Sequence, residues 1–419
     1  MLFIFSPLAA RFEFARQYGL WGPSLQCCWT TGPPHATLGT VKNLVLVGGG
    51  HAHVHILKNF GLHPMPDVRV TLVTREVEAA YSGMLPGFIA GYYTRAQCHI
   101  DLRPLARFAR AHLIHDAAVG LDLERRLVLR NAGDPVPYDV VSLDVGAAPD
   151  RSAIPGAAAH ALVVKPIDRL AAKWEQLIAA PAPRLGLRFT TIGAGAAGIE
   201  LTLAMRHRVR NRLIEAGDNP ERASFTLISA GRILESGNAR ARRLFRNLLN
   251  ARGVTLVENC RAREVASNAI ICADGSRRPF DQVILATQST APAWLRDTGL
   301  PLDSSGFVQI DAELRALGCA NVFAVGDMAS SLVHPRPKAG VFAVRQGPPL
   351  AENLRRALAD EPPVPFHPQQ EYLSLISTGD RSAVAMRGSW AAQGRIFWYL
   401  KDWIDRRWIG SYTNLPLDS

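Results

Sequence analysis

Residues 43–55 (N-L-V-L-V-G-G-G-H-A-H-V-H) constrain this chain more than any other stretch. The first five residues are mostly apolar and predict a buried parallel strand. Gly48, Gly49 and Gly50 then allow a sharp turn into a helix, whose N-terminal N–H groups can bind a diphosphate. The stretch therefore predicts a dinucleotide site. The motif is weak alone, because His53 stands where G-x-G-x-x-G has its third glycine.

A second glycine-rich turn lies in residues 189–200 (F-T-T-I-G-A-G-A-A-G-I-E). Gly193, Gly195 and Gly198 have the full G-x-G-x-x-G spacing, with a predicted strand before them and a predicted helix after them. This is a strong signal for a second dinucleotide diphosphate.

The residue that ends the second strand of each unit should meet an adenosine ribose. In the first unit the strand ends at Thr74, so either the Thr74 hydroxyl or Glu76, two residues later, should hold the ribose. In the second unit the strand ends at Ser229, with Arg232 just beyond. Serine and arginine accept a 2′-phosphate that an acid would repel, so NADPH is a candidate no less than NADH.

Other strands end in small residues that let the chain pass close to a cofactor. The predicted strand 138–146 ends at Gly146, and residues 281–290 repeat this pattern. The run N-V-F-A-V-G-D ends in Gly326 and Asp327. It should place a carboxylate at the carboxyl edge of a parallel sheet, where a cofactor hydroxyl can donate to it.

Residues 81–87 (Y-S-G-M-L-P-G), which include Pro86, are predicted to form a loop. Such small and apolar residues can lie flat against a cofactor ring, or they can make an ordinary turn before a helix. Near the C-terminus, residues 371–388 predict two strands and residues 395–409 predict an amphipathic helix. Its tryptophans and basic residues suit a membrane interface, and the alternative is a lid packed on the core.

Composition and charge exclude some functions. The 419 residues are 48% hydrophobic and carry a net charge of +11, which allows two or three domains and favours anionic partners. No nucleic-acid-binding signature and no apolar run of about 18 to 20 residues is present, so neither nucleic acid nor a membrane-spanning helix is expected. The six cysteines form no C-x-x-C pair, which predicts a reduced, cytoplasmic compartment. Residues 1–41 predict a disordered or targeting extension.

The order of these motifs resembles that of the pyridine nucleotide-disulfide oxidoreductase superfamily over about residues 42–360. Within it, the runs G-G-G-H-A-H-V, Y-S-G-M-L-P-G, H-I-D-L-R-P-L-A-R-F, A-G-V-F-A-V-R-Q-G-P and K-D-W-I-D-R-R are similar to a narrower group. Members of that group occur alone or fused ahead of selenophosphate synthetase, and they are similar to type II NADH dehydrogenases.

The resemblance implies an α/β fold of two interleaved Rossmann-like, glutathione-reductase-like domains with a small C-terminal α+β segment. The implied divisions are an FAD-binding domain in two parts (42–160 and 286–362), an NAD(P)-binding domain (161–285) and the C-terminal segment (363–419). The first glycine turn and Asp327 should hold FAD, and the second turn should hold NADH or NADPH.

The resemblance also places Lys338, Gly340 and Gln346 near the flavin ring. There Lys338 either stabilises negative charge on the reduced ring or caps a loop. The histidines of the first turn should donate to phosphate or pack, and no metal is expected. The predicted cofactor-binding residues are Gly48, Gly49, Gly50, His51, His53, Thr74, Pro86, Gly146, Gly193, Gly195, Gly198, Gly326, Asp327 and Gln346.

Because Cys98 stands alone in the first part of the FAD-binding domain, the sequence predicts a flavoenzyme without a redox disulfide. It should take hydride from NAD(P)H and pass electrons to a second acceptor such as a quinone, in the cytoplasm or on the inner face of a membrane. The alternatives are a reductase in selenium metabolism, suggested by the fused relatives, and an FAD-binding protein with low turnover.

Overall fold

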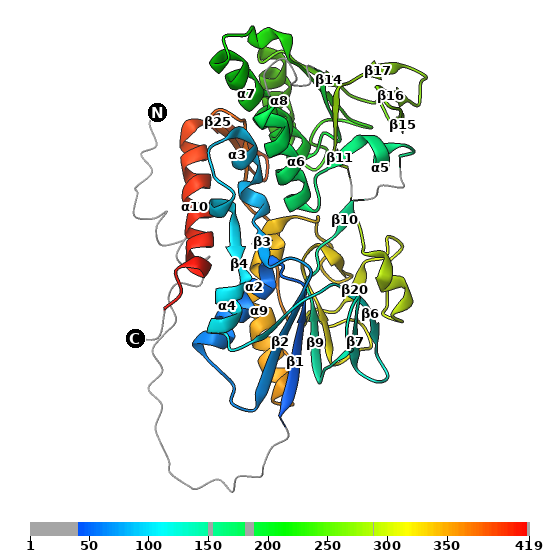
Figure 1. The fold of residues 1–419 in the computed structure, drawn as a ribbon, viewed down its shortest axis with the longest axis vertical. Helices are drawn as coiled ribbons and strands as arrows, with labels where there is room; N and C mark the ends of the chain where they lie inside the picture. Colours follow the sequence, from blue (N-terminus) through cyan, green and yellow to red (C-terminus); the bar gives the residue numbers. More distant parts are fainter. Residues whose placement is uncertain (1–40, 150–153, 181–187, 288, 417–419) are drawn as a thin grey trace, which may run out of the picture. The chain divides into compact units, whose positions relative to one another are not determined.

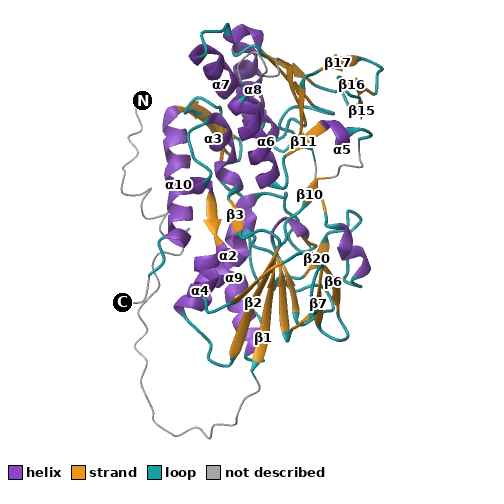
Figure 2. Ribbon diagram, in the orientation of Figure 1, coloured by secondary structure: helices purple, strands orange, loops and turns teal. Residues whose placement is uncertain are grey.

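The computed structural model describes residues 41–149, 154–180, 188–287 and 289–416. The predicted N-terminal extension therefore lies almost entirely outside the described residues, as do Cys27 and Cys28. Two five-stranded sheets form the framework of the described chain, and all neighbouring strands within each sheet are parallel (Figures 1 and 2).

The first sheet has β1 at its centre, between β9 and β2. Its strands, in spatial order, are β21 (Val322–Ala324), β9 (Val140–Leu143), β1 (Lys42–Val47), β2 (Val68–Thr74) and β5 (His112–His115). The four apolar residues that end β1 are fully buried, as expected for a strand covered on both faces.

The second sheet repeats this arrangement around β12. Its strands, in spatial order, are β11 (Ala161–Val163), β18 (Gln282–Leu285), β12 (Arg188–Ile192), β13 (Ser224–Ile228) and β14 (Val254–Val257). The chain builds most of the first sheet, then the second, and returns to the first with β21. The predicted interleaving of two dinucleotide-binding units is confirmed.

Helices follow both glycine turns. α2 (His51–Leu62) begins directly after the first turn and α7 (Ala196–Glu215) after the second. α9 (Gly340–Leu358) runs beside α2, with Arg355 donating to Asn59 over 2.9 Å. The other helices before the C-terminal segment are α3 (Leu85–Ala90), α4 (Leu102–Phe108), α5 (Ala157–His160), α6 (Ile167–Ala179) and α8 (Ala239–Ala251).

Short strands decorate the two units. β6 (Ala118–Asp122) and β7 (Leu127–Arg130) form an antiparallel hairpin. The remaining short strands before the C-terminal segment are β3 (Glu78–Ala80), β4 (His99–Asp101), β8 (Val136–Pro137), β10 (Ala148–Pro149), β15 (Ala262–Val265), β16 (Ala269–Cys272), β17 (Arg277–Pro279), β19 (Ser289–Thr290), β20 (Val308–Ile310) and β22 (Ala329–Ser331).

The C-terminal segment has one strand more than predicted. β23 (Ser374–Ser377) and β24 (Ala383–Arg387) match the two predicted strands, and β25 (Trp390–Gly394) pairs with β24. The sequence W-A-A-Q-G lacks a clear alternation of polar and apolar residues, so β25 gave no periodic signal. The predicted helix is α10 (Arg395–Thr413). No described helix has an apolar stretch long enough to cross a bilayer.

The cysteine prediction needs correction. The sulfur atoms of Cys260 and Cys272 are joined in a disulfide, although the sequence was interpreted as that of a protein with reduced cysteines. Cys260 lies in the loop after β14, and Cys272 ends β16. The two residues are 12 positions apart and come together because β16 runs back along β15, which spacing alone does not reveal.

Candidate functional site

The first glycine turn connects β1 to α2 and lies against the end of β9. Gly48 has a φ of 94°, which favours glycine. A Cβ atom at Gly48 would collide with the main chain of Asp144, and one at Gly50 would collide with the Asp144 carboxyl group. A Cβ at Gly49 would meet the side chain of Leu102. The three predicted glycines thus occupy positions where no side chain fits, as a dinucleotide-binding turn requires.

His53 stands in place of the third glycine and is fully buried. Its Nδ1 lies 2.7 Å from the Gly48 carbonyl oxygen, and its Nε2 lies 2.8 Å from the Ser142 hydroxyl. Burial lowers the pKa of His53 to about 4, so the ring is neutral at pH 7. Both ring nitrogens are already bonded within the protein. The ring therefore fastens the turn to the sheet.

Asp144, at the end of β9, is a site residue that the sequence analysis did not select. Its carboxyl oxygen accepts from the N–H groups of Ala52 (2.9 Å) and His53 (3.2 Å) in the first turn of α2. Burial raises the pKa of Asp144 to about 7, against the opposing effect of these two hydrogen bonds. The sequence signal that could have identified Asp144 was an acidic residue at the end of a buried strand.

His51 provides a test of whether a cofactor fits the first turn. Its Nε2 is buried and has no hydrogen-bond partner among the described residues. Its ring stacks on Trp408 with 5.3 Å between centroids, and burial lowers its pKa to about 4. Unpaired polar atoms are rare in protein interiors. One beside a dinucleotide-binding turn fits a polar ligand such as FAD.

Asp327 and Gln346 meet at the end of β21. The side-chain oxygen of Gln346 accepts from the Gly326 N–H over 2.7 Å, which fixes the turn that carries Asp327. The Asp327 carboxylate forms an ion pair with Lys165, at the start of the second unit. Lys165 was missed because only the tertiary structure brings residues so distant in sequence together.

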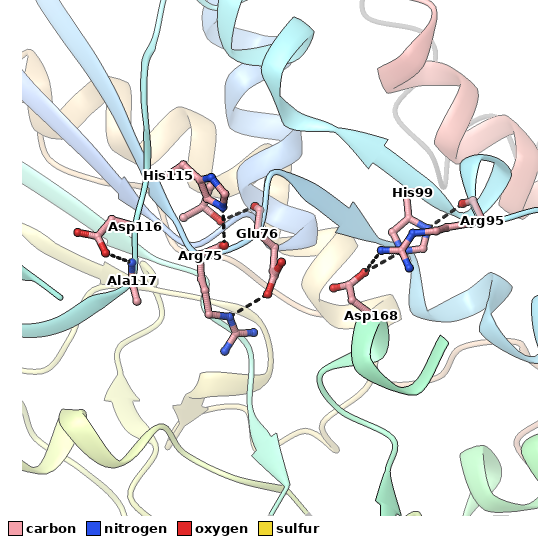
Figure 3. Close-up of polar contacts among 9 residues, drawn as sticks. Arg75, Glu76, Arg95, His99, His115, Asp116, Ala117 and Asp168 are labelled. Atoms are coloured by element: carbon pink, nitrogen blue, oxygen red, sulfur yellow. Dashed lines mark hydrogen bonds and ion pairs between the residues drawn. The ribbon is translucent and has the colours of Figure 1, made fainter. Parts of the chain in front are cut away.

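Figure 3 shows the end of β2, where the first ribose was expected. The Thr74 hydroxyl donates to the Glu76 carbonyl oxygen over 2.9 Å. The Glu76 carboxylate accepts from Arg75 over 3.1 Å, and the Arg75 carbonyl oxygen lies 3.0 Å from His115 Nε2. Both candidates for the ribose contact thus lie within one compact turn.

Figure 3 also shows a link between the two units. Asp168, in α6, lies 2.8 Å from His99 Nε2 and 3.5 Å from Arg95. Burial tends to lower the pKa of His99, but the hydrogen bond and charge of Asp168 outweigh burial and raise it. This ionic cluster holds α6 against β4.

Residues 81–87 form a turn that leads into a helix, the second of the two alternatives, although the helix begins at Leu85, within the predicted loop. Ser82–Met84 is a single 3₁₀ turn, and Pro86 lies buried in the first turn of α3. Proline is favoured at that position because its missing N–H would have no partner there. The Gly83 carbonyl oxygen accepts from Lys401 of α10 over 2.5 Å, so the C-terminal helix covers this turn.

Lys338, which was predicted to lie beside the flavin ring, has partners within the protein. Its ammonium group sits 3.9 Å from the centroid of the Phe307 ring and donates to the Ala329 carbonyl oxygen. Burial lowers its pKa. A cavity of about 130 Å³ lies between Lys338, Asp327 and Gln346. The role of Lys338 towards a flavin stays a prediction.

The second glycine turn matches the full motif. Gly193 has a φ of 109°, and a Cβ there would collide with the carbonyl of Ala286 at the end of β18. A Cβ at Gly198 would collide with the carbonyl of Gly193, so α7 packs directly on the turn. Gly195 and Gly146 have no neighbours that a Cβ would meet within 4 Å. Both positions leave room for a ligand.

The described cysteines offer no reactive thiolate at the first turn. Cys98 is buried, which raises its pKa to about 12, so the thiol stays protonated. The disulfide of Cys260 and Cys272 lies in the second unit, in a core of its own that includes Val265 and Ile270. No group of three metal-ligating side chains occurs among the described residues.

The C-terminal helix packs on the first unit, as the lid alternative expected, through a face of mixed character. Trp398, Ile409 and Tyr412 are buried together with Asp405, which is only 4% exposed. Asp405 accepts from Tyr81 over 3.0 Å and from Lys401 over 2.6 Å. The buried face of α10 therefore holds aromatic and charged side chains side by side.

Comparison with known proteins agrees with this architecture. Residues 42–347 match the pyridine nucleotide-disulphide oxidoreductase family. The NADH dehydrogenase-like protein YutJ of Bacillus subtilis is 21% identical over 69% of this chain and 77% of the relative. The type II NADH:quinone oxidoreductase Ndh of Mycobacterium tuberculosis is 23% identical over 85% of this chain and 82% of the relative.

A solved structure shares the fold. NDH2 from Plasmodium falciparum, in complex with NADH, superimposes with a TM-score of 0.75 at 14% identity, covering 89% of this chain and 98% of that chain. With the family match over most of the chain, the comparisons settle the class that the motif order predicted. The chain belongs to the pyridine nucleotide-disulphide oxidoreductase family and is an FAD-dependent NAD(P)H oxidoreductase, similar to type II NADH dehydrogenases.

Proposed function

We propose that this oxidoreductase passes electrons from NADH or NADPH to a quinone at a membrane surface. When bound, FAD supplies the redox chemistry, accepting a hydride and delivering electrons to the acceptor. The protein's contribution is to hold FAD and the nicotinamide nucleotide in register and to exclude water.

In this proposal, each glycine turn binds one of the two dinucleotides. Gly48, Gly49 and Gly50 receive the FAD diphosphate, Asp327 accepts from a cofactor hydroxyl, and the unpaired His51 nitrogen lies beside them. The turn at 193–198 receives the nicotinamide nucleotide. The ion pair of Lys165 and Asp327 supports this division, because it joins the start of the second unit to the FAD side of the first.

The cysteine chemistry supports a direct route from flavin to a small acceptor. Cys98 is buried and protonated at neutral pH, and the disulfide belongs to a core in the second unit. A thiol relay beside the flavin therefore has no partner among the described residues. The relative from Mycobacterium tuberculosis is named as a quinone oxidoreductase, which favours a quinone here.

The outward face of α10 supports the proposal that the protein binds a membrane surface. Ile396, Tyr399 and Trp403 are 72%, 51% and 47% exposed, on a helix whose other face buries Trp398, Ile409 and Tyr412. Aromatic and aliphatic residues flanked by cations suit the boundary between lipid headgroups and acyl chains. The flanking exposed arginines are Arg395, Arg406 and Arg407.

Anaerobic mixing tests the electron-transfer part. The purified protein should be yellow, NADH or NADPH should bleach the flavin, and a soluble quinone should restore the colour. Bleaching without recovery would exclude quinone as the acceptor. A yellow protein that neither nucleotide bleaches would instead be an FAD-binding protein with low turnover.

Vesicle binding tests the membrane part separately. The double variant Ile396→Ser, Trp403→Ser should bind anionic vesicles about tenfold less tightly, because it removes apolar area from the outward face. Val119→Ser is the matched control, since Val119 is 44% exposed in the β6 hairpin. Equal binding by all three proteins would refute a membrane role for α10.

A further inference from the structure

The end of β13 forms one edge with the loop that follows β14. The Ser229 N–H donates to the Val257 carbonyl over 2.8 Å, and the Cys260 N–H donates to the Ser229 carbonyl over 2.8 Å. The Asn259 N–H donates to the Gly231 carbonyl over 3.2 Å. In a dinucleotide-binding unit, this carboxyl edge of the second strand is where the adenosine ribose lies.

The strand end itself carries no acid, because residues 229–232 are Ser-Ala-Gly-Arg. Two carboxylates lie near this edge. The exposed Glu235 has its Oε2 atom 3.7 Å from the place of a Cβ at Gly231. Glu258 accepts from the Ile233 N–H over 2.7 Å and from Arg246 over 2.8 and 2.9 Å. Its pKa is lowered, first of all by the hydrogen bonds from Arg246. Glu258 is thus neutralised and occupied by its own neighbours.

The same edge provides what a phosphate needs. Ser229 is nearly buried, and its hydroxyl makes only a long 3.4 Å contact with the Arg232 carbonyl oxygen. Arg232 is exposed, and its guanidinium makes no hydrogen bond within the described residues. Arg261 follows Cys260 on the adjacent loop and is also exposed. Guanidinium groups bind phosphates through paired, charge-assisted hydrogen bonds.

We propose that Ser229 and Arg232 bind the 2′-phosphate of NADPH, which makes NADPH the preferred electron donor. This inference rests on the proposed function, because it names the donor for the same nucleotide site. Arg232 supplies the charge, Ser229 donates a hydrogen bond, and the loop at 258–261 holds both against the strand end. NADH lacks the phosphate and therefore makes no ion pair with Arg232.

Binding of adenosine 2′,5′-bisphosphate and 5′-AMP to the oxidised holoprotein tests this without turnover. Calorimetry should give at least about tenfold tighter binding of the bisphosphate, equivalent to about 1.4 kcal/mol. Arg232→Gln should remove most of that preference and leave 5′-AMP binding unchanged. Arg243→Gln is the matched control, because Arg243 is exposed on α8, away from the strand end.

Steady-state kinetics give the second readout. The wild-type protein should have a higher kcat/KM with NADPH than with NADH, and Ser229→Asp should reverse the order by repelling the phosphate. Equal affinity for the two probes, or equal loss of both in Arg232→Gln, would overturn the inference. If the bisphosphate preference holds but neither nucleotide bleaches the flavin, the proposed function fails and the phosphate site stands.

Discussion

The two glycine turns perform the same geometric task on two sheets. In each, the first glycine has a positive φ and lies so close to the end of the neighbouring strand that no Cβ fits. That neighbour is Asp144 for Gly48 and Ala286 for Gly193. The repeated contact shows that the close passage of turn and strand, more than the full glycine motif, defines the unit.

The turns differ at the third motif position. Gly198 lets α7 pack directly on the Gly193 carbonyl, whereas the equivalent His53 bonds to the Gly48 carbonyl through its ring. A hydrogen-bonded ring can thus replace a close backbone contact as the link between turn and helix. His53, which weakens the match of the first turn to the glycine motif, therefore links the turn to its helix in a different way.

The turns also differ at the strand end that faces the helix. The Asp144 carboxyl group occupies the N–H groups of Ala52 and His53, while Ala286 has no side-chain acceptor to do so at the second turn. Some of the free N–H groups at the start of α2 therefore have partners within the protein, whereas those at the start of α7 stay available for a ligand. This fits a resident cofactor at the first turn and an exchanging one at the second.

The largest expected effect is at Gly198. Gly198→Val should abolish flavin reduction by NAD(P)H, with a loss of about 100-fold or more, because the side chain would push α7 away from the turn. The FAD content should not change. Stopped-flow absorbance measures the rate, and circular dichroism controls for the fold. A variant that lost FAD but still bound NADPH in calorimetry would reverse the assignment of the two turns.

A smaller effect is expected at His53. His53→Gly restores the common motif but removes two buried hydrogen bonds, and should lower the free energy of unfolding by about 2 to 4 kcal/mol. His53→Gln can keep one bond and should lie in between. Urea denaturation measures both. Wild-type stability in the glycine variant would show that the ring does not hold the turn.

The smallest effect is a pH dependence at Asp144. Burial raises its pKa from 3.8 to about 7, so the proton stabilises the fold at low pH and this contribution is lost as the pH rises towards 7. Asp144→Asn keeps a neutral acceptor and should gain stability relative to wild type between pH 5 and pH 8, by about 1 to 2 kcal/mol. A pH-independent difference in urea denaturation would contradict this. Asp134→Asn, which removes an exposed acid in the loop before β8, is the control.

Local patterns predicted the strands, the glycine turns and the order of the two units. These features are determined by residues that are close together in the sequence, so apolar runs and glycine spacing are enough to predict them. The same patterns failed for β25, whose small residues form a strand only through pairing with β24. They also missed that the helix after the turn at 82–84 already includes Pro86. Helix and loop signals overlap wherever proline stands near glycine.

The sequence by itself determined the framework, from the strand before Gly48 to the carboxylate at Asp327. Only the tertiary structure decided that Lys165 pairs with Asp327, that Asp144 caps α2 and that α10 buries Asp405 while exposing Trp403. A helix's amphipathic pattern names two faces but not which one meets the protein. That choice depends on partners such as Tyr81, more than 300 residues away, and so on which distant segments the fold brings together.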